Sequence, residues 1–249
     1  MLRRSLPLVV VAAALVIASN GLPHAQTLGG PTVPSWVGSL LMGSDPMMGA
    51  DPSSPTVTDS LGFKFELFFS AADNLDPVNA TNQVISIDVD TTGAIIGVAV
   101  RKLNPGIKIA TLTDQLQLKY YFPARTCAGG SPRIQLAIDT DGDGISNGNA
   151  FGYVGHGGFG SGCLTGVWDF VDMTDSVPFR WDLTQFGLGY HNWQTAVDAI
   201  TTAFPNHHVL RGVLVDDSGS FAPTAVGRAY YDLVTIGHRT LENWQDTVH

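Results

Sequence analysis

The stretch RIQLAIDTDGDGISNGNAFGYVGHGGFGSGC, residues Arg133 to Cys163, carries most of what the sequence predicts. Its first seven residues alternate between polar and apolar, as in a half-buried strand, and an acidic loop punctuated by glycine follows. A second short run, AFGYVG, then leads into a glycine-rich segment that ends on one of the chain's two cysteines. Short strands separated by turn residues are typical of all-β proteins.

The same pattern continues on both sides of this stretch. Strand-like runs are LGFKFELFFS, QVISIDVDTTGAIIGVAVRKL, KIATLTDQLQLKYYF, GVWDFVDM, PFRWDL, HHVLRGVLVDD and RAYYDLVTIG. The second of these contains Thr91-Thr92-Gly93, a turn signal that predicts a hairpin of two adjacent strands. Strands do not alternate regularly with helices, so the predicted fold class is all-β, a jelly-roll-like β-sandwich with one amphipathic helix near the C-terminus.

That helix is predicted in NWQTAVDAITTAFP. Trp193, Val197 and Ile200 recur at helical spacing and would form its buried face. Asn192 can cap the first turn, and Pro205 would end the helix.

The N-terminus predicts export. Residues 1–25 combine two early arginines with an apolar run from Leu6 to Ala18 and then small residues, as in a secretory signal peptide. An uncleaved anchor is the alternative, although the run is short for a membrane span. Residues 26–60 form a Pro-, Gly- and Ser-rich leader, and 61–249 the β-sandwich domain. The mature chain is expected to be secreted or periplasmic, with no membrane span.

Charge and cysteine content fit this location. The net charge of the 249 residues is −9, so electrostatic binding to nucleic acid is not expected. Among the 22 acidic residues only Glu66 and Glu242 are glutamate, and aspartate favours turns and calcium loops. Cys127 and Cys163 are predicted to form one disulfide, as is usual in exported proteins; two free thiols are the alternative.

The acidic loop is the candidate metal site. Asp139, Asp141 and Asp143 take positions 1, 3 and 5, Ile145 could offer its carbonyl at position 7, and Asn147 lies at position 9. This spacing resembles the first half of an EF-hand loop and suits calcium in a structural role. Position 12 is Ala150 instead of the bidentate glutamate of an EF-hand, and a strand precedes the loop instead of a helix. The loop is therefore closer to the DxDxDG loops of secreted repeat and sandwich proteins. A polar turn without metal is the alternative.

No catalytic motif stands out. The chain has no GxSxG elbow and no HExxH pair, and a non-enzyme is favoured over an enzyme. Trp168 and Trp181 are candidates for ligand binding, because an exposed indole can stack on the apolar face of a sugar ring. Burial in the core is the competing interpretation for both.

The C-terminal runs VLRGVLVDDSG and GRAYYDLVTIG resemble the closing strands of secreted jelly-roll domains of the concanavalin-like and carbohydrate-binding-module type. The matching residues are Tyr230, Asp232, Val234 and Thr235. The resemblance implies a β-sandwich with structural calcium and glycan binding, and it assigns no ligand residue.

Three functions follow as hypotheses. The first is non-catalytic binding of glycan or another cell-surface polymer. The second is an extracellular polysaccharide lyase or glycosidase on the same scaffold. The third is a purely structural surface or matrix domain. A sheet face with exposed aromatic rings would favour the first, and a cleft with paired carboxylates the second.

Overall fold

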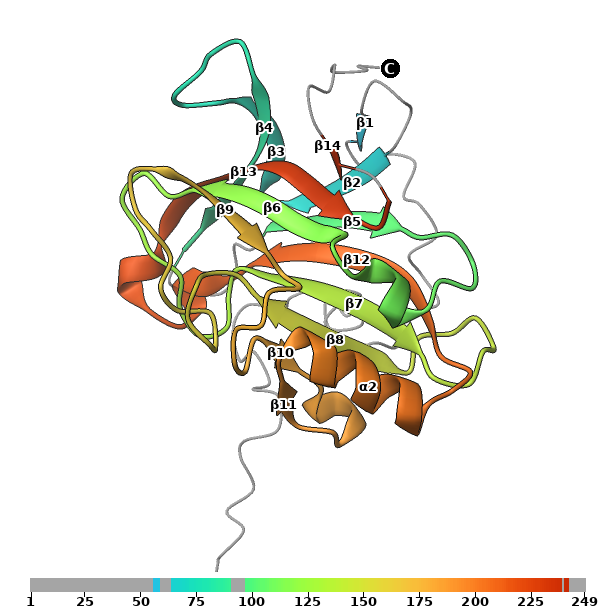
Figure 1. Cartoon of the computed structure of the whole chain (residues 1–249). Helices are drawn as coiled ribbons and strands as arrows, with labels where there is room; N and C mark the ends of the chain where they lie inside the picture. Colours follow the sequence, from blue (N-terminus) through green and yellow to red (C-terminus); the bar gives the residue numbers. More distant parts are fainter. Residues whose placement is uncertain (1–55, 59–63, 91–96, 239, 242–249) are drawn as a thin grey trace, which may run out of the picture.

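The computed structural model describes residues 56–58, 64–90, 97–238 and 240–241. They form two antiparallel sheets with one α-helix beside them (Figure 1). The predicted all-β sandwich is therefore confirmed, whereas jelly-roll connectivity stays a prediction.

The large sheet has eight strands. In spatial order they are β1 (Thr56–Thr58), β2 (Lys64–Phe69), β5 (Gly97–Lys102), β12 (His208–Asp216), β7 (Arg133–Asp139), β8 (Gly148–Tyr153), β10 (Trp181–Asp182) and β11 (Tyr190–His191). β1 lies inside the segment predicted as a leader and pairs with β2, so the sheet includes residues that precede the predicted domain boundary at Leu61.

The small sheet has six strands. In order they are β3 (Ala71–Leu75), β4 (Gln83–Val89), β13 (Gly227–Ile236), β6 (Leu116–Tyr121) and β9 (Trp168–Asp172), and β14 (Thr240–Leu241) pairs with β13. Short 3-10 helices lie at η1 (Ile109–Leu112), η2 (Thr184–Phe186), η3 (Ser218–Ser220) and η4 (Pro223–Ala225).

The main core receives side chains from both sheets. Ile134, Leu136 and Leu214 come from the large sheet, and Ile85 and Tyr231 from the small one; all five are fully buried. Period-two alternation explains this arrangement, because every second residue of these strands turns toward the facing sheet.

The predicted hairpin over residues 83–103 is wrong. β4 belongs to the small sheet and β5 to the large sheet, so the chain crosses between the layers instead of turning back beside itself. A Cβ built on Gly97 would lie 2.1 Å from Ile87 Cγ2, which places the two strands face to face across the core. Both strands are almost entirely buried. A run of apolar residues with a turn in the middle fits a crossing between layers as well as a hairpin.

The predicted helix is confirmed as α2 (Trp193–Ala203), the longest helix in the described part of the chain. Asn192 caps it by accepting a hydrogen bond from Thr195 N at 3.0 Å. Trp193, Val197 and Ile200 are buried, as their spacing requires.

The predicted disulfide is also confirmed, since Cys127 and Cys163 are bonded with their Cα atoms 5.7 Å apart. The predicted signal peptide and most of the predicted leader lie outside the described residues. Among the described helices, none has the length and apolar character that crossing a membrane demands.

Candidate functional site

The acidic loop joins β7 to β8 and brings three carboxylates together. Oxygen atoms of Asp139, Asp141 and Asp143 lie within 4.8 Å of one another. Asp139 ends β7 and is buried, whereas the other two are exposed. The spacing of alternate residues around a tight turn therefore produces the predicted convergence, and the cluster could hold a metal ion.

Backbone donors hold Asp139 in its charged form. Its Oδ1 accepts from Asp141 N at 3.1 Å and from Gly142 N at 2.7 Å, and its Oδ2 accepts from Gly144 N at 2.8 Å. Burial alone would raise the pKa of this carboxyl, but these three hydrogen bonds lower it below the usual value. A carboxylate that stays ionised while buried is suited to a cation.

The left-handed backbone at Gly142 and Gly144, with φ of 86° and 87°, lets the loop curl around Asp139. Asn147 Oδ1 accepts from Thr140 N at 2.6 Å and closes the base of the loop. Ile145 donates its N–H to Asp143 Oδ1 at 2.7 Å and exposes its side chain. Metal ligation by the Ile145 carbonyl and by Asn147 stays a prediction.

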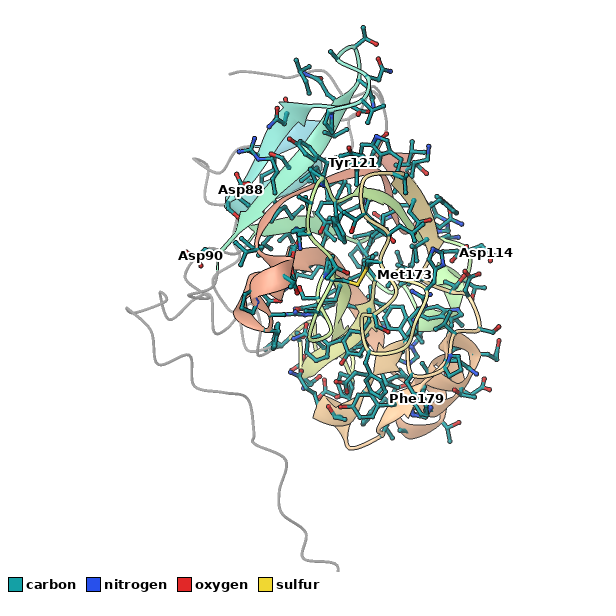
Figure 2. The ribbon with its side chains drawn as sticks, turned by 90° about the vertical axis from the view of Figure 1, so that its left-hand side faces the viewer. Asp88, Asp90, Asp114, Tyr121, Met173 and Phe179 are labelled. Atoms are coloured by element: carbon teal, nitrogen blue, oxygen red, sulfur yellow. A yellow bond between two sulfur atoms is a disulfide. The ribbon has the colours of Figure 1, made fainter. Side chains whose placement is uncertain are left out.

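The outer face of the small sheet carries a row of aromatic rings. Tyr121 of β6 lies between Trp168 of β9 and Tyr230 of β13, with ring centroids 5.6 and 6.3 Å away. All three are partly exposed, whereas their chain neighbours Tyr120 and Tyr231 are buried in the core. Figure 2 shows Tyr121 at the end of the domain near the β3–β4 hairpin. Trp168, the ligand-binding candidate of the sequence, is therefore part of a row of three partly exposed aromatic rings.

Trp181 is not part of any such surface. Its side chain is 0% exposed, its Nε1 donates to Met173 O at 2.9 Å, and its ring packs 4.9 Å from that of Trp193. The prediction that Trp181 binds ligand is therefore wrong. β10 places it against Gly152, where a Cβ would lie 2.8 Å from the indole, so the absent glycine side chain makes room for the ring in the core.

The indole of Trp168 is oriented by a residue that follows β3, the strand at the opposite edge of the small sheet. Its Nε1 donates to Asp76 Oδ1 at 3.1 Å, although Asp76 follows β3 and lies 92 residues earlier. Asp76 Oδ1 also accepts from Val78 N at 2.7 Å. Burial would raise the pKa of the Asp76 carboxyl, but its hydrogen bonds lower it. An ionised acceptor thus fixes the rotation of the indole.

A second carboxylate lies close by. Asn82 Nδ2 donates to Asp76 Oδ2 at 3.3 Å and to Asp232 Oδ2 at 3.1 Å, so one amide joins the two acids. Burial raises the pKa of Asp232, in contrast to that of Asp76. Both side chains are nearly buried, which makes them better suited to hold the β3–β4 turn against the sheet than to reach a large substrate.

Sequence reasoning did not show that Tyr121 and Tyr230 adjoin Trp168, or that Asp76 orients its indole. The YYF run and the Tyr230-Tyr231 pair each signal one inward and one outward ring. This alternation does not show which strands are neighbours in the sheet. β6 pairs with both β9 and β13, which lie far from it in the sequence, so the three rings meet only in the folded chain.

No protein-family model matches this chain, and searches of curated proteins and of solved structures found no significant match. The resemblance to carbohydrate-binding jelly-roll domains accordingly stays a prediction.

Proposed function

We propose that this chain is an exported, non-catalytic β-sandwich that binds glycan or similar cell-surface material through the outer face of the small sheet. The observation that supports this most directly is the row formed by Tyr121, Trp168 and Tyr230. Flat aromatic rings offer an apolar surface to the CH face of a pyranose, and nearby polar groups can bond to its hydroxyls. The disulfide agrees with an oxidising compartment.

We further propose that the acidic loop binds calcium in a structural role. Three carboxylates provide hard oxygen ligands, and calcium accepts six to eight of these in flexible geometry. Without a cation, charges at this separation repel one another. The loop is formed by the β7–β8 connection, so a bound ion would stabilise that connection without a direct part in ligand binding.

Native gel electrophoresis in the presence of soluble xylan, mixed-linkage β-glucan or glycol chitin tests the glycan proposal. Wild-type protein should be retarded by one of these polymers, and Trp168→Ala should weaken the binding about 5- to 30-fold, as loss of a stacking ring of about 1–2 kcal/mol predicts. Phe221→Ala is the control, because this ring is exposed, more so than that of Trp168, but lies outside the aromatic row. Equal retardation of wild type and Trp168→Ala would contradict the proposal.

Polysaccharide cleavage is the second candidate, because Asp76 and Asp232 have oppositely shifted pKa values and Asp76 bonds Trp168 of the aromatic row, although the burial of both carboxylates favours their structural role. Release of new reducing ends from the retarding polymer, abolished in Asp232→Asn, would establish it. Retention of an intact polymer by wild-type protein would leave binding as the function.

A further inference from the structure

A second group of aromatic rings lies at the other end of the domain. Phe159 and Phe179 stack with centroids 5.4 Å apart and planes 15° apart, and Tyr190 meets Phe159 edge-on at 5.1 Å. They are 49%, 50% and 40% exposed, respectively. We call these three residues the distal cluster. Its rings come from three separate segments: the glycine-rich loop, the turn before β10, and β11.

Two residues of the distal cluster have strained backbones. Phe159 has φ of 59° and Phe179 has φ of 57°, a left-handed conformation that bulky residues rarely adopt. Such strain destabilises the fold and persists only where the surroundings impose it. Strained residues cluster at functional sites, so two of them at half-exposed rings that touch each other point to a functional surface.

The surroundings impose this conformation through contacts on the glycine-rich loop. A Cβ on Gly158 would lie 2.6 Å from Pro178 O, and one on Gly160 would lie 2.8 Å from Gly130 Cα. Only glycine lets the loop approach these backbones closely enough to bring Phe159 to Phe179.

Three further links fix the same loop. The Cys127–Cys163 disulfide anchors its end, and Gly157 N donates to Ser161 O at 2.9 Å within it. His156 Nε2 lies 2.7 Å from Asp169 Oδ2 on β9. The loop that carries Phe159 is therefore tied down before any ligand arrives, which lowers the entropic cost of binding.

Polar groups adjoin these rings. Tyr153, whose ring lies 6.5 Å from that of Phe159, donates its hydroxyl to Asp182 Oδ2 at 2.8 Å. The Tyr190 hydroxyl is protonated at neutral pH, and burial followed by Asp182 raises its pKa further, so it can donate a hydrogen bond to a ligand. Apolar rings with a few neighbouring donors and acceptors form the usual lining of a small-ligand site.

The size of the distal cluster favours a ring-sized ligand over a protein. Aromatic side chains offer about 200 Å² each, so three half-exposed rings provide about 300 Å² in total. A stable protein interface needs about 800 Å² from each partner. A ligand with an apolar face and a hydroxyl-bearing edge matches both the area and the chemistry.

We propose that the distal cluster is a second sugar-binding site, so that one chain binds a glycan polymer at two places. This proposal rests on the glycan-binding function. In Figure 2, Phe179 and Tyr121 lie at opposite ends of the domain, so the two sites are separate. Two sites on one polymer raise the apparent affinity by about 10²–10⁴-fold where both can engage together.

Isothermal titration with cellohexaose, xylohexaose and chitohexaose tests the proposal by stoichiometry. Wild-type protein should bind two molecules of the preferred hexasaccharide, and Phe179→Asn and Trp168→Ala should each bind one. Affinity for the matching polymer should fall at least about tenfold in both variants as avidity is lost. Phe221→Ala, which removes a ring of 52% exposure outside both clusters, should bind as wild type.

Phe179→Asn is chosen because asparagine tolerates the left-handed backbone, so its melting temperature should equal or exceed that of wild type. Wild-type stoichiometry in Phe179→Asn would overturn this inference and leave the sheet-face proposal intact. Loss of one site in Phe179→Asn with no change in Trp168→Ala would overturn the sheet-face proposal instead. Absence of binding by wild-type protein to all three probes would overturn both.

Discussion

The acidic loop and the glycine-rich loop follow each other in the chain but are shaped by different forces. The acidic loop is local: Asp139 bonds backbone groups two, three and five residues ahead, and Asn147 closes it over Thr140. The glycine-rich loop depends on distant partners, with Cys163 bonded to Cys127 and Gly158 packed on Pro178. Breaking the long-range links of the glycine-rich loop should therefore disturb that loop and spare the acidic one.

Among the changes that compare the two loops, removal of the disulfide should lower the stability of the protein most. The double variant Cys127→Ser with Cys163→Ser opens a loop of 36 residues that the disulfide closes. By the chain-entropy model, this should lower the unfolding free energy by about 4 kcal/mol. Urea denaturation of wild type and of the double variant measures the difference.

The same variant should separate the two loops. Hydrogen exchange of amides in residues 155–163 should become faster, because their anchor is gone, while amides of residues 140–145 keep wild-type protection. Equal loosening of both loops would contradict the division into local and long-range control.

This division also explains how far sequence reasoning reached. Asp139, Asp141 and Asp143 could be predicted to converge because the spacing of one segment determines their geometry. The α2 helix was predictable for the same reason, since its cap and its apolar face lie within one stretch of sequence. Both are features in which every deciding residue is a near neighbour in the chain.

Features that depend on strand neighbours were not accessible in this way. Trp168 and Trp181 have similar sequence surroundings, yet β9 is an edge strand of the small sheet and β10 lies over Gly152 in the core. The stacking of Phe159 on Phe179 requires three segments to meet. The crossing from β4 to β5 likewise depends on which sheet each strand joins, and alternation cannot reveal that.

Ile200→Ala should have the next largest effect and tests the local helix. Ile200 is fully buried in the main core, so truncation should lower the unfolding free energy by about 2–4 kcal/mol through lost burial and a new cavity. Thermal or urea denaturation measures it. Gln194→Ala, on the exposed face of the same helix, is the control and should change stability by less than about 0.5 kcal/mol. A similarly small change in Ile200→Ala would show that this face does not pack.

Glycine substitutions compare the two loops directly. Gly158→Ala should cost about 1–3 kcal/mol, because its Cβ would meet Pro178 O at 2.6 Å. Gly144→Ala should cost about 1–2 kcal/mol for a different reason: its surroundings are open but its φ is 87°.

Asparagine distinguishes these causes, since it tolerates the left-handed backbone but still has a Cβ. Gly144→Asn should recover most of the stability lost in Gly144→Ala, whereas Gly158→Asn should be no better than Gly158→Ala. Recovery at both positions would mean that backbone conformation, not space, limits the glycine-rich loop. Melting temperatures of the four variants decide between the two causes.

Calcium should give the smallest effect, confined to the acidic loop. Because Ala150 stands where an EF-hand has its bidentate glutamate, the dissociation constant should fall in the extracellular range of about 10⁻⁴–10⁻³ M. About 1 mM calcium would then stabilise the fold by about 0.4–1.4 kcal/mol. For a domain of this size, that corresponds to a rise of about 1–5 °C in melting temperature over protein in chelator.

Asp141→Ala should abolish the rise, while Asp198→Ala, which removes an exposed acid on α2, should retain it. The disulfide variant should also retain it, because every carboxylate of the cluster lies within one turn of chain. If the wild-type protein has the same melting temperature in calcium and in chelator, the loop is a polar turn that binds no calcium.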